Sequence, residues 1–280
     1  MREIDLNLVR INVRDACLRA NKKLPDDITE LIDKYRECES CDIARRILNL
    51  MKENSECALE NDLPVCQDTG MVVIFARIGQ DVHFVNGDFR EAVNSGVSDA
   101  YVGGYMRCSV VADPLDRVNT NNNTPCVIYS EIVPGDRVSF LVTPKGFGSE
   151  NMSKIKMFTP SATTEDILDF IVDCVKTAGS NPCPPVVVGV GIGGTFDYCA
   201  VLAKKALCRG KDCVADGLIY QNLEIEALKR INSLNIGPQG FGGDTTALKV
   251  NIEHSATHIA GLPVAVNMGC YVTRHAEFEI

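Results

Sequence analysis

The spacing of apolar residues changes near Gly70, and this change constrains the fold more than any other feature of the chain. Before that point apolar side chains recur every three or four positions, as at Val9 and Val13, a spacing that predicts amphipathic helices. After Gly70 the apolar runs have the length of strands and are bounded by Gly, Pro and Asn. The sequence therefore predicts a mixed α+β protein with a helical N-terminal segment, residues 1–60, and an α/β core, residues 61–280.

The individual elements can be predicted from the same patterns. Strands are expected at residues 72–78, 126–132, 137–143, 186–190 and 263–267, and helices beyond the first segment at residues 89–102, 164–174, 195–207 and 218–234. The turn-forming residues Pro134, Gly135 and Asp136 separate the second strand from the third, so these two are predicted to form a hairpin. No internal repeat is visible, and we expect helices packed around small sheets in a single domain, residues 1–280.

Charge and hydropathy exclude several classes of partner. The formal net charge is −9, which argues against a nucleic-acid backbone or an anionic membrane as the main partner. The longest apolar stretches, such as residues 186–190 and 262–268, fall far short of the roughly 20 residues that cross a bilayer. The N-terminus mixes charges of both signs without an apolar secretion signal. We therefore expect a cytoplasmic protein.

Cysteine is unusually frequent, with thirteen residues in the chain. A disulfide framework is not expected in a reducing compartment, so the alternatives are buried apolar thiols and a subset that binds metal. Cys66, Cys183 and Cys270 stand out because turn residues flank them beside predicted strands; prolines on both sides of Cys183 also stiffen its backbone. They lie far apart in the sequence, so spacing alone does not decide between burial and a metal site.

A second candidate pair is Cys38 and Cys41, which form a CxxC motif among helical patterns. Such a pair can be a redox couple or half of a zinc site. The chain offers no convincing second pair, and a structural role is the favoured interpretation.

The segment VVVGVGIGGTFD contains Gly189, Gly191 and Gly194 in the spacing of a dinucleotide-binding fingerprint. No acidic residue follows at the end of a strand at the required distance. The favoured interpretation is a glycine turn that lets the chain approach a bound group, with a helix beginning at Thr195 whose positive end favours an anion.

His254 and His258 are four residues apart, a spacing that could place both on one helix face as metal ligands. No HExxH motif accompanies them, so hydrogen-bonded structure is the favoured role for the pair. His258 is also considered for proton chemistry near Cys270.

Four segments taken together resemble one enzyme family. PVCQDTG, KGFGSENMS, NPCPPVVVGVGIGGT and ATHIAGLPVAVNMGC resemble the alpha subunits of class I, iron–sulfur-dependent fumarate hydratases and of L-tartrate dehydratases. The resemblance implies a [4Fe-4S] cluster held by Cys66, Cys183 and Cys270. One iron without a thiolate ligand would then act as a Lewis acid on the substrate.

The resemblance also implies roles for five further residues. Gln67 and Asp68 are expected to contact the substrate, with orientation of a metal ligand as the rival role of Asp68. Arg107 is expected to bind a carboxylate, and Gly148 to offer its backbone to the substrate. His258 is expected to line the site, so Asp68 and His258 are the predicted catalytic residues.

The expected activity is reversible hydration of fumarate, a small dicarboxylate, to L-malate, with L-tartrate or a methylated dicarboxylate as the nearest alternative substrates. Longer relatives continue into a second domain, whereas this chain ends at Ile280. The resemblance therefore implies a separate beta subunit and a hetero-oligomer. Two other classes stay open: a non-catalytic iron–sulfur or zinc redox sensor, and a nucleotide-binding oxidoreductase.

Overall fold

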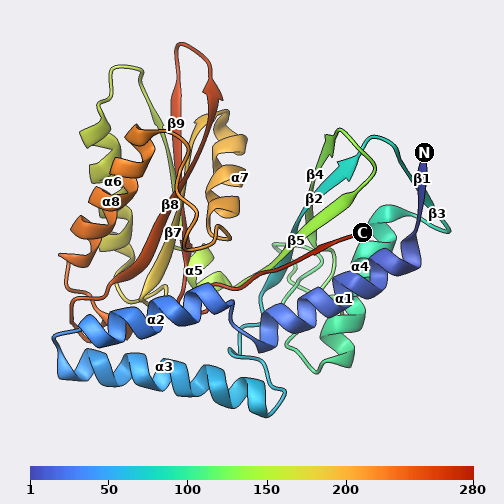
Figure 1. Ribbon diagram of the computed structural model, residues 1–280, viewed down its shortest axis with the longest axis horizontal. Coiled ribbons are helices and arrows are strands. Elements are labelled where there is room, and N and C mark those ends of the chain that lie inside the picture. The colour runs from blue at the N-terminus through green and yellow to red at the C-terminus, as the bar shows by residue number, and fades with distance from the viewer. The chain divides into compact units, whose positions relative to one another are not determined.

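The computed structural model describes residues 1–280, which cluster into two compact units (Figure 1). Unit 1 comprises Met1–Pro25, Ser55–Phe147 and Arg274–Ile280, and unit 2 comprises Asp26–Asn54 and Gly148–Thr273. The predicted mixture of helices and small sheets is confirmed. The single-domain organisation stays a prediction. No helix is long and apolar enough to span a bilayer.

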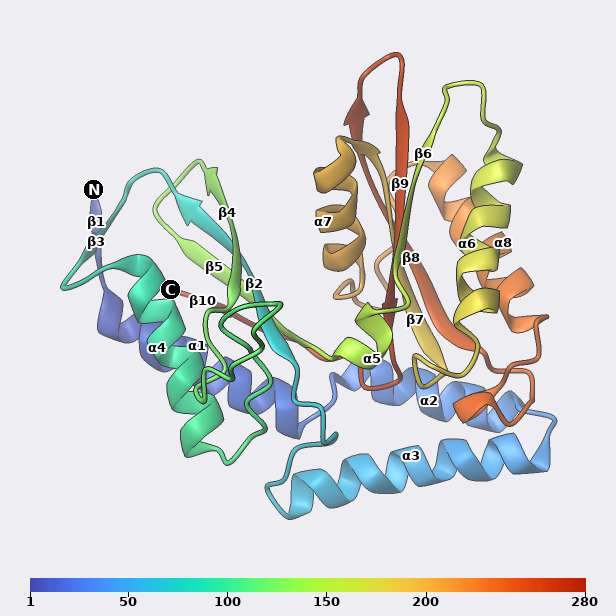
Figure 2. The same cartoon turned by 180° about the vertical axis from the view of Figure 1, so that it is seen from behind.

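Unit 1 is built on a four-stranded sheet in the order β10-β5-β2-β4, with β1 and β3 forming a separate parallel pair. Its elements are β1 (Arg2–Asp5), α1 (Leu6–Lys22), β2 (Met71–Gly79), β3 (Val82–Val85), α4 (Phe89–Gly103), β4 (Val127–Val133), β5 (Val138–Lys145) and β10 (Ala276–Glu279). Helix α1 begins after Asp5, whose carboxylate accepts a hydrogen bond from the Asn7 N–H. The pKa of Asp5 is lowered, mainly by this hydrogen bond. Helices α1 and α4 pack against each other, and α1 also packs on β5 and β10 (Figure 2).

The predicted hairpin of β4 and β5 is wrong, because β2 lies between these two strands. Strand β2 pairs with β4 in parallel and with β5 in antiparallel orientation. Its residues from Val72 to Ala76 are all buried, whereas β4 exposes Ser130 and Glu131. The strand that is apolar on both faces therefore takes the centre of the sheet, and the half-polar strand takes the edge.

Unit 2 has three layers. Its elements are α2 (Asp26–Cys38), most of α3 (Asp42–Glu60), most of the short α5 (Phe147–Glu150), β6 (Lys154–Phe158), α6 (Thr164–Ala178), β7 (Val186–Gly194), α7 (Phe196–Ala206), α8 (Leu218–Asn232), β8 (Ala247–Thr257) and β9 (Leu262–Gly269). Helices α6 and α8 cover one face of the sheet and α7 covers the other (Figures 1 and 2). Helix α6 starts with a capping box in which Thr163 and Asp166 bond reciprocally.

The two four-stranded sheets share one plan, although no repeat is visible in the sequence. The sheet of unit 2 has the order β6-β9-β7-β8. In unit 1 the strand β2 has β4 beside it in parallel and β5 in antiparallel orientation. In unit 2 the strand β7 has β8 beside it in parallel and β9 in antiparallel orientation. The remaining strand of each sheet comes from the chain segment that leaves the other sheet. Strand β6, which follows β5, joins the sheet of unit 2, and β10, which follows β9, joins the sheet of unit 1. The chain thus passes from one unit to the other directly before Gly148 and directly after Thr273.

The glycine-rich segment is part of a strand, so the prediction of a glycine turn there is wrong. Strand β7 continues through Gly194, and α7 follows at Phe196. A Cβ on Gly189 would lie 2.1 Å from the Ala203 carbonyl oxygen. A Cβ on Gly191 would lie 2.0 Å from the carbonyl oxygen of Cys199. These glycines let α7 pack closely on β7, which also removes the reason to assign a dinucleotide site.

Replacing Gly191 by alanine is therefore expected to destabilise unit 2 by about 1–3 kcal/mol, the usual cost of overpacking a core. Gly103 offers a matched control, because a Cβ there would meet no atom within 4 Å. Thermal unfolding of both variants tests the expectation. A Gly191→Ala protein as stable as Gly103→Ala would show that this glycine does not serve helix packing.

Candidate functional site

Two of the three candidate cysteines come together at one end of the unit 2 sheet. Cys183 precedes β7, Cys270 follows β9, and these strands are antiparallel neighbours in which Val187 pairs with Gly269. The amide of Tyr271 donates to the Cys183 carbonyl oxygen at 3.4 Å. The loops that carry Cys183 and Cys270 are thus in direct contact.

Cys183 is held in an unusual conformation. Its φ is 54°, in the left-handed region that a residue with a side chain seldom adopts, and its amide donates to the Ser180 carbonyl oxygen at 3.1 Å. The residue is exposed, and Cys270 is partly exposed. A strained, exposed cysteine is typical of a functional position more than of a packing position.

The segment containing Gly148 lies beside the Cys183 loop. A Cβ on Gly148 would have no neighbour nearer than the Asn181 carbonyl oxygen, at 3.9 Å. Gly148 also has no positive φ that would require glycine. Neither packing nor backbone conformation within the chain therefore explains the absence of a side chain there, and this open space beside Asn181 can receive a bound group.

The third candidate cysteine belongs to unit 1, in the loop before β2. The Cys66 Sγ lies 3.5 Å from the Gln67 side-chain oxygen, and Gln67 itself is exposed. Both carboxylate oxygens of Asp68 are engaged by backbone amides, Oδ1 by Gly70 at 3.0 Å and Oδ2 by Phe147 at 2.9 Å. Within unit 1, Asp68 thus ties the loop of Cys66 to Phe147 and orients this loop.

A buried guanidinium lies under this loop. Arg274 is 3% exposed, one of its Nη atoms donates to the Asp68 carbonyl oxygen, and its Nε is buried without a hydrogen-bond partner. It forms no ion pair within the chain. A buried cation without an anionic partner is costly, so this loop favours a bound group of negative charge.

Arg107 is placed for binding an anion from solution. The Thr69 hydroxyl donates to the Arg107 carbonyl oxygen at 2.9 Å, which fixes the backbone of Arg107 to the loop of Cys66. The side chain of Arg107 is exposed and has no hydrogen-bond or ion-pair partner in the chain.

The structure does not bring His258 to Cys270. His258 lies in the turn before β9 and Cys270 follows the other end of that strand, which spans about 26 Å at 3.3 Å per residue. The alternative in which His254 and His258 share a helix face does not apply, since His254 lies on β8. There its ring stacks on Tyr220 at 4.0 Å and its Nε2 lies 3.1 Å from the Asp216 carbonyl oxygen, which is a structural role.

The remaining cysteines differ from the candidates in burial. None of the thirteen forms a disulfide. Burial raises the pKa of Cys126 and of Cys174 to about 12, and it raises the pKa of Cys17 as well. These thiols stay protonated and act as small apolar side chains.

Iodoacetamide is therefore expected to modify Cys183 in the folded, metal-free chain at neutral pH and to spare Cys17 and Cys174. Exposure and access to the thiolate govern alkylation, and the two buried thiols have neither. Mass spectrometry of the digested protein measures each site. Equal labelling of Cys17 and Cys183 before unfolding would contradict the assignment.

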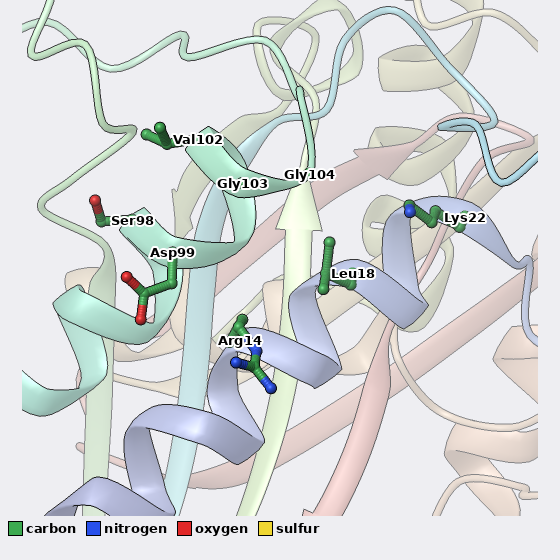
Figure 3. Close-up of a pocket in the computed structure, with 8 residues that line it drawn as sticks. All are labelled: Arg14, Leu18, Lys22, Ser98, Asp99, Val102, Gly103 and Gly104. Carbon is green, nitrogen blue, oxygen red and sulfur yellow. The ribbon is translucent and has the colours of Figure 1, made fainter.

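The surface groove between α1 and α4 does not belong to the candidate site. It has a volume of about 540 Å³ and is lined by residues such as Arg14, Leu18 and Asp99, which Figure 3 shows on the facing helices of unit 1. No candidate catalytic or ligand residue lines it. Within neither unit does a group of three or more His, Cys, Asp or Glu side chains form a ready metal site.

Reasoning from the sequence missed Gln239 and Arg274. Gln239 donates twice to the carbonyl oxygen of Pro184, next to Cys183, and Arg274 supports the loop of Cys66. Gln239 lies in the glycine-rich segment 237–244, GPQGFGGD. No sequence signal marks the contact of either side chain.

The comparisons with known proteins agree on one family. The model of the family described as fumarate hydratase (Fumerase) matches residues 11–279. The provisionally named L(+)-tartrate dehydratase subunit alpha of Methanocaldococcus jannaschii is 39% identical over 259 residues, 90% of this chain and 90% of the relative. The L(+)-tartrate dehydratase subunit alpha of Escherichia coli is 30% identical over 262 residues, 92% of this chain and 86% of the relative. The chain therefore belongs to the fumarate hydratase (Fumerase) family, as its four motifs predicted.

Proposed function

We propose that this chain is the cluster-bearing subunit of a hydro-lyase that reversibly adds water to fumarate to give L-malate. The observation that carries the proposal is the contact between the loops of Cys183 and Cys270, with Cys183 exposed and in a left-handed conformation. Together with Cys66 they provide three thiolates for a [4Fe-4S] cluster. Three ligands suit a catalytic cluster because the fourth iron stays open.

The residues fit such a group on several counts. A cluster in the usual 2+ state with three thiolates carries a net negative charge, and the buried Arg274 beside the loop of Cys66 lacks an anionic partner. The Gln67 side chain already contacts the Cys66 sulfur and can turn its amide to donate to a thiolate. The space at Gly148, next to Asn181, is open.

The chain's own residues then bind and orient the substrate. When bound, the cluster would supply a Lewis acid for the hydroxyl group of L-malate and for one carboxylate. Arg107 binds the other carboxylate by charge-assisted hydrogen bonds, and the backbone at Gly148 contacts the substrate. Asp68 holds the Cys66 loop and the start of α5 in register through its two backbone contacts. His258 has no part in this constellation, because the length of β9 separates it from Cys270.

A separate beta subunit completes the enzyme in this proposal. Two relatives are named as alpha subunits, which implies a partner chain for them. When L-malate loses water, a proton must also leave the carbon beside the one that bears the hydroxyl group. No residue of this chain is assigned to that step. We propose a hetero-oligomer in the cytoplasm, a reducing compartment that suits thirteen cysteines without a disulfide.

L-tartrate is the second candidate substrate, favoured by the names of the relatives. Its dehydration gives oxaloacetate and water by the same loss of a hydroxyl group. The test is to purify the chain anaerobically with a beta subunit encoded in the same organism and to compare kcat/KM for fumarate and for L-tartrate. A higher value for fumarate supports the proposal, a higher value for L-tartrate makes that the substrate, and activity on neither contradicts both.

The chain without a beta subunit is expected to lose at least about 100-fold of the activity of the complex, the cost commonly seen when one group that stabilises the transition state is removed. The assay is fumarate hydration before and after the beta subunit is added to the cluster-loaded chain. Full activity of the chain alone would contradict the two-subunit account.

A further inference from the structure

The CxxC motif and the glycine-rich segment 237–244, which the proposed function leaves unassigned, meet in unit 2. Glu39, between the two cysteines, is 2% exposed. Its carboxylate accepts the amide of Cys41 at 3.1 Å, the amides of Asp244 and Thr245 at 2.9 and 3.0 Å, and the Thr245 hydroxyl at 2.7 Å. Such a set of donors satisfies a buried carboxylate, so Glu39 fixes this loop to the junction of α2 and α3.

The contact is reciprocal, and the loop has little freedom. The Asp244 carboxylate accepts the amide and hydroxyl of Ser40 at 3.1 and 2.5 Å, and these bonds lower the pKa of Asp244. A Cβ on Gly243 would lie 2.6 Å from the Ala44 Cβ. A Cβ on Gly237 would lie 1.9 Å from the Gly242 carbonyl oxygen. The loop is therefore held in one shape by its two acidic anchors and by close backbone contacts.

Gln239 projects from this loop to the residue after Cys183. Its backbone amide and its side-chain Nε2 both donate to the Pro184 carbonyl oxygen, at 2.8 and 3.0 Å. Gln239 has a φ of 54°, a conformation that costs a residue with a side chain roughly 1 kcal/mol and costs glycine almost nothing. Other positions of the same loop are glycine, so a side chain at 239 points to a use for its amide.

We propose that Gln239 is a positioning residue for Cys183, and that Glu39, which lies between Cys38 and Cys41, anchors the Gln239 loop. This proposal rests on the proposed function, in which Cys183 is a cluster ligand. Gln239 fixes the carbonyl group of Pro184, the residue after Cys183, while Ser180 and Tyr271 fix the peptide groups of Cys183 itself. The three contacts together set the direction of the thiol, so that it need not be ordered when the cluster binds.

The test compares Gln239→Met and Gln239→Gly with a matched control, Gln221→Met. Gln221 is also in unit 2 and half-buried, and its Nε2 also donates to a backbone carbonyl oxygen, that of Ala215 at 2.9 Å. Gln239→Gly keeps the backbone donor and relieves the left-handed strain, so its melting temperature should stay close to that of the native chain. Cys183→Ser is the reference for a lost ligand.

Two readouts separate positioning from stability. In the metal-free chain, hydrogen exchange followed by mass spectrometry should be faster in peptides covering residues 180–185 and 270–272 for both Gln239 variants and unchanged for Gln221→Met. In the cluster-loaded chain, release of iron to a chelator should be roughly tenfold faster for the Gln239 variants, the effect of losing about one hydrogen bond.

The outcomes distinguish this inference from the proposed function. If the native chain and Cys183→Ser bind equal iron, the cluster assignment fails, whereas faster exchange in the Gln239 variants would still establish the positioning contact. If Cys183→Ser loses iron but both Gln239 variants match Gln221→Met in exchange and release, the positioning role is overturned. A zinc or disulfide at Cys38 and Cys41 in the purified protein would overturn the structural role of the CxxC motif.

Discussion

Cys183→Ser is expected to remove hydratase activity by more than about 100-fold, since even loss of an outer partner of a metal ligand commonly costs 10–100-fold. Serine cannot replace a thiolate as a soft ligand for iron. The exposed, strained position of Cys183 means that the substitution removes little packing, so the folded chain should persist. Anaerobic purification, iron analysis and the fumarate assay with the beta subunit measure the effect.

Cys174→Ser is the matched control. Cys174 is fully buried on α6, and burial raises the pKa of its thiol to about 12. Its replacement should lower the melting temperature while leaving iron content unchanged, because a buried hydroxyl needs a hydrogen-bond partner. Equal loss of iron from both variants would mean that cluster loss follows general destabilisation and not loss of a ligand.

Arg107→Gln is expected to lower kcat/KM for a dicarboxylate by about 10- to 150-fold, because hydrogen bonds to a charged group contribute about 1.5–3 kcal/mol. The backbone of Arg107 is tied to the loop of Cys66 through Thr69, so the guanidinium is carried by a fixed segment. Iron content should not change. Steady-state kinetics of the complex, with iron measured on the same samples, test both statements.

Arg117→Gln serves as the control for this arginine. Arg117 is also exposed in unit 1, and its guanidinium donates to the Pro114 carbonyl oxygen. Its loss changes the net charge equally, so a general electrostatic effect on the anionic substrate would appear in both variants. Equal kinetics for Arg107→Gln and Arg117→Gln would remove Arg107 from the substrate site.

Local patterns predicted the elements better than their arrangement. Strand β2 and helix α4 appear close to the predicted residues, since apolar periodicity and flanking turn residues act over short distances. The pairing of β4 and β5 was mispredicted because an adjacent turn suggests a hairpin, whereas burial on both faces places β2 between them. The four-residue strand β1 inside the predicted helical segment was missed because it pairs with β3, which is distant in the sequence.

The glycines of β7 show why a motif needs its structural context. Gly189 and Gly191 have the spacing of a phosphate-binding turn, yet they lie inside a buried strand against α7. Only the position of the helix across the strand distinguishes the two uses of glycine. A strand that continues past Gly189 and Gly191 excludes the tight turn on which the dinucleotide fingerprint depends.

The candidate site was partly visible in the sequence. Turn residues around Cys66, Cys183 and Cys270 distinguished them from buried cysteines such as Cys174, and the contact of the last two loops agrees with that choice. The contact of Gln239 with the loop of Cys183 could not be predicted, because Gln239 and Pro184 lie far apart in the sequence.

The cluster at Cys66, Cys183 and Cys270 is tested most directly by the iron and acid-labile sulfide content of the anaerobically purified chain, native and with Cys270→Ser. We expect about four irons and four sulfides per native chain, and loss of the cluster or of part of its iron in the variant. Stoichiometric zinc, or a folded native chain that takes up no iron under reconstituting conditions, would contradict it.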